Sequence, residues 1–252
     1  EVKQEKKIVA VYQYKDLEGN LVHETVRYEP KSFVQRRPDG KGSYIYKDVF
    51  KDIKPLLYNL KAVVEAIKND KVIYVVEGEK DVDNLGKLGL VATTNPMGAG
   101  KWQDHYSDYL VNASVVIVPD NDEPGKQHAQ DIAKSLYCKA KSIKIVELPG
   151  LPAKGDVTDF FLNIGSKTKG INKLNELVAA ASEWTPPQEK SLTICLDSVE
   201  VEEVKWLWKP YIPIGKLTLL QGDPGQGKTY LAVNIAAIVS RGGSFPEGES
   251  FN

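Results

Sequence analysis

Cysteine, histidine and long apolar runs are all scarce in this chain of 252 residues, and each shortage excludes a class of protein. The two cysteines, Cys138 and Cys195, lie far apart in the sequence, which excludes a disulfide-stabilised scaffold and a cysteine-rich zinc site. The three histidines show no metal-ligand spacing, so we expect no structural metal. No apolar run approaches the roughly 18–20 residues needed to cross a bilayer, which excludes a membrane-spanning protein.

Net charge is also nearly absent, because 34 acidic residues balance 33 basic ones. This balance excludes a uniformly basic protein that coats DNA. The overall sum nevertheless hides a basic segment, in which six Lys or Arg residues stand against only Glu29 and Asp39. Two interpretations stay open for this segment: a surface that binds nucleic acid or nucleotides, and a solvated hairpin rim. The six basic residues are Arg27, Lys31, Arg36, Arg37, Lys41 and Lys47.

The two ends of the sequence do not resemble those of a complete protein. The first residue is Glu1 rather than Met, and the residues after it lack the basic start and apolar core of a signal peptide. The last residues, from Ser244 onward, are a polar stretch directly after a predicted helix. We therefore expect an internal piece of a longer, cytoplasmic polypeptide.

Hydrophobic patterning predicts an α/β protein. Short apolar strands alternate with single amphipathic helices, which favours a parallel sheet with helices on both faces. The predicted strands of this part cover residues 72–76, 91–94, 114–118 and 142–147, and the predicted helices cover 80–88, 102–110, 125–136 and 171–182. A β-rich part with strands at 8–14, 21–28 and 43–46, a turn at 36–42 and a helix at 56–68 precedes it.

These patterns predict three domains and a linker. The consecutive prolines Pro186 and Pro187 forbid a helix and stiffen the chain, so they mark the linker. A strand at residues 217–221 and a helix from Lys228 to about Arg241 follow it. The predicted parts are a β-rich basic subdomain (1–69), the parallel-sheet domain (70–182), the linker (183–192) and the start of a further domain (193–252).

Three carboxylates follow the ends of two predicted strands. Glu77 comes directly after the strand at 72–76, and Asp120 and Asp122 come after the strand at 114–118. Because ligands of open parallel sheets bind beyond the carboxyl ends of the strands, we expect these side chains to meet there. Clustered carboxylates repel one another unless a cation such as Mg²⁺ or Mn²⁺ neutralises them. For either segment alone, ordinary turn residues remain an equal alternative.

The two segments together resemble the Toprim domain of bacterial-type primases, type IA and II topoisomerases and some nucleases. Val75-Val76-Glu77-Gly78-Glu79-Lys80-Asp81 matches its glutamate motif, and Val118-Pro119-Asp120-Asn121-Asp122 matches its DxD pair. The resemblance covers about residues 70–165 and implies Mg²⁺-dependent formation or cleavage of phosphodiester bonds. It implies that Glu77 acts in acid/base work and holds metal, that Asp120 and Asp122 hold metal, and that Asp81 is the further acid of the primase branch.

The flanking segments resemble those of primase-type Toprim proteins from phages, plasmids and bacteria. The resemblance implies a basic subdomain that holds template and nucleotide, with Tyr28 and Phe33 available for stacking on bases. Asp156 and Asp159 either extend the acidic site or cap a helix, and both interpretations stay open. The implied template- and nucleotide-binding residues are Arg27, Lys31, Arg36 and Arg37.

A complete phosphate-binding loop lies near the end of the sequence. The segment from Gly222 to Thr229 fits the pattern G-x-x-x-x-G-K-[ST] between a predicted strand and a predicted helix. Backbone N–H groups of such a loop surround phosphate oxygens, the lysine reaches the terminal phosphates, and the threonine ligates Mg²⁺. The predicted ATP-binding residues are Gly222, Gly225, Gly227, Lys228 and Thr229.

The loop resembles the start of a RecA-like or RepA-like ATPase, the helicase half of primase–helicase fusions. No second apolar strand ending in an acid follows within the sequence, so we expect a truncated domain whose residues from about 193 are poorly anchored. Trp206 and Trp208 are expected to belong to the core of that domain or to its nucleotide rim.

The leading hypothesis is the catalytic region of a DNA primase, a nucleotidyltransferase, joined to the start of an ATP-dependent helicase domain. Its expected partners are a single-stranded DNA template, ribonucleoside triphosphates and other replication proteins, with oligomers formed through the helicase domain and no membrane. A Toprim nuclease is a second hypothesis, although nucleases that combine these domains carry the ATPase first. A catalytically inactive module that binds nucleic acid or partner proteins is the third. A topoisomerase would need a tyrosine nucleophile on a separate domain.

Overall fold

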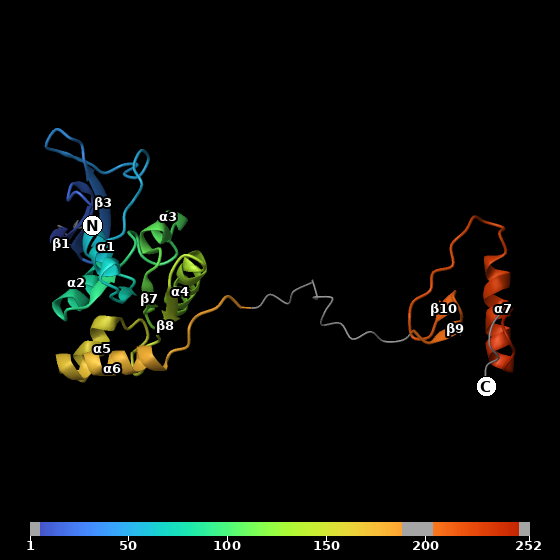
Figure 1. Ribbon diagram of the computed structural model, residues 1–252. Coiled ribbons are helices and arrows are strands. Elements are labelled where there is room, and N and C mark those ends of the chain that lie inside the picture. The colour runs from blue at the N-terminus through green and yellow to red at the C-terminus, as the bar shows by residue number, and fades with distance from the viewer. Residues whose placement is uncertain (1–5, 188–203, 247–252) are drawn as a thin grey trace. The chain divides into compact units, whose positions relative to one another are not determined.

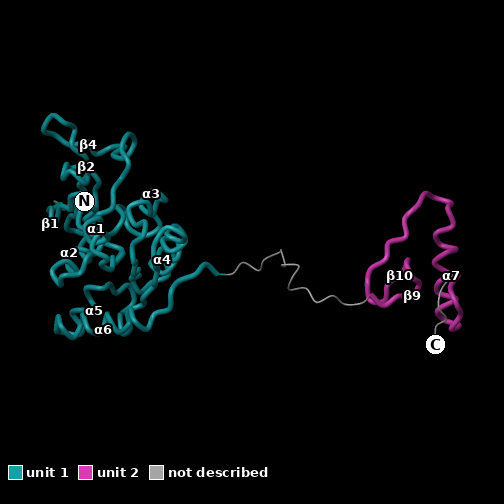
Figure 2. Tube along the Cα trace, viewed as in Figure 1, with its two compact units in different colours: residues 1–187 teal, residues 188–252 magenta. Residues whose placement is uncertain are grey.

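The structure is a computed structural model that describes residues 6–187 and 204–246. The chain divides into two compact units, residues 1–187 and 188–252 (Figure 2). The boundary between them falls inside the predicted linker. The β-rich subdomain and the parallel-sheet domain, which the sequence predicts as separate domains, lie together in the first unit.

The first unit begins with an antiparallel sheet in the order β1-β2-β3-β4. Figure 1 labels its strands β1 and β3, in blue. The predicted turn at residues 36–42 is partly wrong, because Arg36 and Arg37 lie inside strand β3 and pair across to Glu24 of β2 and to Ile45 of β4. Cross-strand pairing extends β3 to Pro38, where the turn begins. The strands are β1 (Lys7–Lys15), β2 (Leu21–Glu29), β3 (Ser32–Pro38) and β4 (Tyr44–Ile45).

The second sheet of this unit is parallel, in the order β6-β5-β7-β8. Side chains of a strand point alternately to its two faces, and Ile73 and Val75 accordingly pack into one apolar core while Tyr74 packs into another. The prediction of a parallel sheet covered on both faces is therefore confirmed. The strands are β5 (Ile73–Val75), β6 (Val91–Thr93), β7 (Ser114–Ile117) and β8 (Ser142–Ile145).

Helices cover the two faces of the parallel sheet. Buried residues of α1 and α4 belong to the same core as Ile73, whereas those of α2, α5 and α6 belong to the core of Tyr74. The helix predicted at 102–110 is wrong in its length: only α3 is α-helical, and residues 108–110 tighten into a 3-10 turn. The helices are α1 (Leu60–Lys68), α2 (Glu79–Lys87), α3 (Asp104–Ser107), α4 (Glu123–Leu136), α5 (Val157–Ile164) and α6 (Lys167–Ala180).

The second unit contains a small hairpin and one helix. Strands β9 (Trp206–Trp208) and β10 (Ile212–Pro213) pair, and α7 (Lys228–Arg241) has the predicted bounds. The predicted strand at 217–221 is wrong: no described residue pairs with it, and the side chains of Leu217 and Leu219 are 97% and 82% exposed. No residue of α7 is buried among the described residues, in line with the expectation of poor anchoring.

Trp208 of β9 stacks on the buried ring of Phe245, with ring centroids 5.0 Å apart, and meets the ring of Tyr211 edge-on. The first residues of the predicted further domain, 193–203, lie outside the described residues. None of the described helices is both long and apolar enough to span a membrane.

Candidate active site

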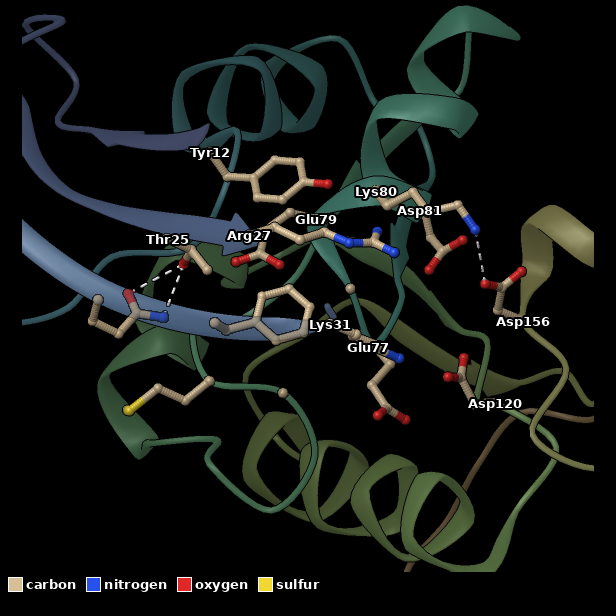
Figure 3. A pocket seen from close by; sticks show the side chains of 15 residues that line it. Tyr12, Thr25, Arg27, Lys31, Glu77, Glu79, Lys80, Asp81, Asp120 and Asp156 are labelled. Carbon is tan, nitrogen blue, oxygen red and sulfur yellow. Dashed lines mark hydrogen bonds and ion pairs between the residues drawn. The ribbon is translucent and has the colours of Figure 1, made fainter. Parts of the chain in front are cut away.

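The predicted acids meet at the carboxyl ends of two neighbouring strands. β5 and β7 are adjacent and parallel, with Val75 opposite Ile117, so the segments that carry Glu77 and Asp120 leave the sheet side by side. A cleft of about 300 Å³ opens at this edge of the sheet (Figure 3). Its acidic lining consists of Glu77, Glu79, Asp81, Asp120 and Asp156.

Burial and mutual repulsion make these carboxyl groups reluctant to ionise. Burial, followed by the negative charges of Glu77 and Asp81, raises the pKa of Asp120 to about 8. Burial and the charge of Asp122 raise the pKa of Glu77, which Lys31 partly counteracts. One carboxylate oxygen of Glu77, Oε2, is buried without a hydrogen-bond partner among the described residues. A cation bound here would therefore favour the ionised carboxylates and relieve their mutual repulsion.

The backbone around Asp120 and Asp122 is held from both sides. Asp122 is the N-cap of α4, where its Oδ1 accepts the N–H of Gly125 at 2.9 Å. Asn121 donates its N–H to the carbonyl of Gly155 at 3.0 Å, and its side chain donates to the carbonyl of Leu151 at 3.0 Å. A methyl group at Gly125 would lie 2.9 Å from the backbone oxygen of Asp120, so only glycine permits this approach.

Asp122 serves the fold as well as the predicted site. Its cap bond occupies one carboxylate oxygen, and Asp122 does not line the cleft, although its charge reaches Glu77. Asp81 lines the cleft and accepts a hydrogen bond from the hydroxyl of Thr158. Burial raises the pKa of Asp81, and the Thr158 bond acts in the opposite direction.

No group of three or more Asp, Glu, His or Cys side chains among the described residues is arranged to hold a metal ion. Mg²⁺ is often bound by one or two carboxylates together with substrate phosphates rather than by a cage of protein ligands. The unpartnered oxygen of Glu77 and the raised pKa of Asp120 fit that mode of binding. The residues present therefore suit Mg²⁺ or Mn²⁺ as part of a metal–substrate complex.

The predicted basic residues separate into two pairs. Arg27 and Lys31 line the cleft together with Phe33, whose side chain is 48% exposed (Figure 3). Arg36 instead donates to the buried carboxylate of Glu24 at 2.6 Å, and its guanidinium lies 3.9 Å from the ring centroid of Tyr44.

Arg37 forms an ion pair with Asp52, in which Nη2 lies 3.5 Å from Oδ2, and Arg37 does not line the cleft either. Tyr28 lines a second hollow of about 400 Å³, which shares Arg27 and Lys31 with the cleft. Only Arg27 and Lys31 of the four predicted basic residues are thus brought together with the acids.

Both interpretations of Asp156 hold, whereas Asp159 acts as a cap. Asp156 and Asp159 form a reciprocal capping box at the start of α5, in which each side chain accepts a backbone N–H of the other residue. Asp156 also lines the cleft, where its Oδ2 lies 3.3 Å from Nζ of Lys80. It therefore adds to the acidic site while it stabilises the helix.

Sequence reasoning missed the buried contact between Tyr14 and Glu79. The hydroxyl of Tyr14, in β1, donates to Oε1 of Glu79 at 2.8 Å, and both residues are buried. The bond joins the antiparallel sheet to the first residue of α2, two positions after Glu77. Alternation along β1 puts Tyr12 and Tyr14 on one face, but no sequence signal pairs Tyr14 with a residue 65 positions away.

The predicted phosphate-binding loop precedes α7 in the second unit. Gly225 and Gly227 adopt positive φ angles of 83° and 76°, as an inward-turning loop requires. The Lys228 ammonium donates to the carbonyls of Gly222 and Asp223 at 2.7 and 2.6 Å. A cavity of about 430 Å³ lies along the loop, lined by Gly222, Gly227 and Lys228 among others, and Thr229 lies in the first turn of α7.

Sequence comparison shows the family to which this chain belongs. The Gene 57 protein of Mycobacterium phage D29 is 30% identical to the chain over 116 residues, which are 46% of this chain and 69% of the phage protein. The chain belongs to the family of that phage protein. Residues 184–251 of this gene 57 family member also match the model of an AAA domain.

Solved structures show which fold the gene 57 family member has. The Aquifex aeolicus primase, comprising zinc binding and RNA polymerase domains, is similar to it with a TM-score of 0.52 and 20% identity. The match covers 69% of this chain and 40% of the primase. A DnaG catalytic core is similar with a TM-score of 0.50 and 16% identity, over 69% of this chain and 53% of that one. The fold implied by the Toprim resemblance is therefore confirmed, and the chain spans about half of these structures or less.

Proposed function

We propose that residues 1–187 form the catalytic unit of a DNA primase, a nucleotidyltransferase that joins ribonucleotides on a single-stranded DNA template. The observation that carries this proposal is the cleft in which Glu77 and Asp120, at the ends of adjacent strands, face Arg27 and Lys31 of the antiparallel sheet. A cleft with acids on one wall and bases on the other suits a metal-bound triphosphate. The primase fold of the unit supports the same reaction.

The chemistry assigns a role to each wall. Arg27 and Lys31 would bind the triphosphate oxygens of the incoming nucleotide, and exposed Phe33 would stack on a base. Glu77 would accept the proton of the primer 3′-hydroxyl with one carboxylate oxygen, leaving the other for the metal, as that hydroxyl attacks the α-phosphorus and pyrophosphate leaves. Asp120, with Asp122 and Glu77, would hold Mg²⁺, which neutralises charge on the attacking and leaving oxygens when bound.

The second unit is proposed to be the start of an ATP-dependent helicase domain that binds ATP at Gly222 to Thr229. The AAA-domain match and the positive φ angles of Gly225 and Gly227 support this assignment. The proposed partners of the whole protein are single-stranded DNA, ribonucleoside triphosphates and other replication proteins. Subunits would assemble through the helicase domain, and the protein would act in the cytoplasm.

A product assay tests the proposal. The protein is incubated with single-stranded DNA, Mg²⁺ and labelled ribonucleoside triphosphates, and products are separated by length. We expect short oligoribonucleotides from the wild type and about a hundredfold less from Asp120→Asn, since that change removes one charge at almost constant shape. Shortened DNA without new RNA would indicate a nuclease. Absence of both products, with DNA still bound, would indicate a binding module.

A further inference from the structure

The loop between β6 and α3 forms part of the cleft wall. Met97 and Gly98 line the cleft, and both have positive φ angles, 71° and 73°. A positive φ is costly for a residue with a side chain such as Met97, so the surrounding contacts must hold the loop in this shape.

Two buried side chains supply those contacts. The amide of Asn95 donates to the carbonyls of Pro96 and Gly98 at 3.0 and 2.9 Å, and its Oδ1 lies 3.1 Å from Nε2 of His128 in α4. The N–H of Gly100 donates to Nδ1 of His128 at 3.1 Å. His128 thus bridges the two ends of the loop, and Asn95 spans its middle.

These bonds determine the state of the histidine. Nδ1 accepts the N–H of Gly100, so the proton of the neutral ring lies on Nε2 and is donated to Asn95. Burial lowers the pKa of His128, with the nearby charge of Asp131 opposing, which keeps the ring neutral. Both ring nitrogens of His128 are therefore occupied by hydrogen bonds to the loop.

The same turn also fixes the backbone of Glu77. The hydroxyl of Thr94 donates to the carbonyl of Glu77 at 2.9 Å, and the N–H of Val76 donates to the carbonyl of Thr93 at 3.1 Å. The end of β6 therefore ties the 95–100 loop and Glu77 into one frame on one side of the cleft.

We propose that Asn95 and His128 are positioning residues, which hold the 95–100 loop so that Met97 and Gly98 form the wall against a bound nucleoside triphosphate. This inference rests on the proposed function. Neither residue lines the cleft, so their effect on the substrate passes through the loop. A wall that contacts the substrate equally throughout the reaction lowers KM and leaves kcat unchanged.

The intact protein tests this with His128→Ala, Asn95→Ala and the conservative His128→Asn, whose side-chain oxygen can still accept the N–H of Gly100. His105→Ala is the matched control, because His105 also hydrogen-bonds to a backbone group, the carbonyl of Pro55, and does not line the cleft. We expect His128→Ala and Asn95→Ala to raise KM for the nucleotides about five- to tenfold with kcat within about twofold. In His128→Asn, KM should stay close to the wild-type value, and His105→Ala should leave KM unchanged.

Amide hydrogen exchange of residues 97–101 separates this inference from the proposed function. The Gly100 amide should exchange slowly in the wild type and in His105→Ala, and at least tenfold faster in His128→Ala. Unchanged exchange in His128→Ala, or a lower melting temperature with unaltered KM, would overturn the inference even where primer synthesis is intact. If the wild type makes no product but His128→Ala still speeds exchange of the Gly100 amide, the proposed function and the wall against the nucleotide are refuted, whereas the contacts that hold the loop are supported.

Discussion

Asp120 contributes to the pH dependence of stability in the metal-free protein. Its pKa is about 8 in the folded state and about 3.9 when unfolded, so between these values only the folded state holds the proton. The contribution of Asp120 to the free energy of unfolding therefore falls as pH rises from about 4 to about 8. Buried His23, whose pKa burial lowers to about 4, has the opposite effect up to about pH 6.5, so we expect the net fall between pH 6.5 and 8. We expect Asp120→Asn, measured by thermal unfolding in EDTA at pH 8, to raise the melting temperature by about 2–4 °C.

With Mg²⁺ present, the wild type should instead have a higher melting temperature than Asp120→Asn. A cation stabilises the ionised carboxylates, so it should raise the melting temperature of the wild type, more at pH 8 than at pH 6. Asp120→Asn should lose most of this gain. A wild-type protein that is as stable at pH 8 as at pH 6.5 without metal would contradict the raised pKa of Asp120.

A buried hydrogen bond from Tyr14 to Glu79 joins the antiparallel sheet to helix α2. Tyr14→Phe removes the donor and leaves the buried carboxylate of Glu79 without it, so we expect a loss of about 1–3 kcal/mol in the free energy of unfolding. Tyr58→Phe is the control, because the bond from Tyr58 to Asp83 is exposed and its loss should cost under about 1 kcal/mol. Denaturant titration measures both, and equal losses would contradict the assignment.

At the scale of elements, the start of α4 positions the site. Gly125→Ala would bring a methyl group to 2.9 Å from the backbone of Asp120 and 3.2 Å from Asp122. We expect the segment to shift, with at least a tenfold loss of primer synthesis and about 1–3 kcal/mol of stability. Gly86→Ala, on the exposed side of α2 with open space around it, should instead stabilise the protein by about 0.5–1 kcal/mol. Full activity in Gly125→Ala would show that Asp120 need not be held there.

Hydrophobic patterns along the sequence predicted the strands whose side chains are buried on both faces of the sheet. β5 and β7 are short, largely apolar and followed by acids, so their pairing and the meeting of Glu77 with Asp120 could be predicted. Residues 217–221 also include three leucines but form no strand, because a strand needs a neighbour to share its hydrogen bonds.

Side-chain roles that depend on contacts distant in sequence could not be predicted. Arg36 and Arg27 are alike as sequence features, but pairing with Glu24 across β2 and β3 commits Arg36 to the sheet. Arg27 is left to line the cleft. The bonds of His128 to Asn95 and Gly100 likewise arise only when α4 packs beside the 95–100 loop.

For the whole molecule, the net charge of −1 is the sum of acidic and basic regions that bind different ligands. The acidic and basic walls of the cleft lie in the first unit, and the phosphate-binding loop lies in the second. In the full-length protein, Lys228→Ala should lower ATP hydrolysis by about a hundredfold while primer synthesis stays within about threefold of the wild type. Asp120→Asn should lower primer synthesis by about a hundredfold and leave ATP hydrolysis within about threefold of the wild type. Loss of both activities in Lys228→Ala, in a protein that remains folded, would contradict this division.

The most direct test of the central claim is whether the template dictates the product. Two single-stranded templates are prepared whose sequences differ only by exchange of A with T and of G with C, and the RNA made on each with Mg²⁺ is sequenced by mass spectrometry. We predict products complementary to each template, and none from Asp120→Asn. RNA of the same sequence from both templates, or shortened DNA in place of RNA, would contradict the account.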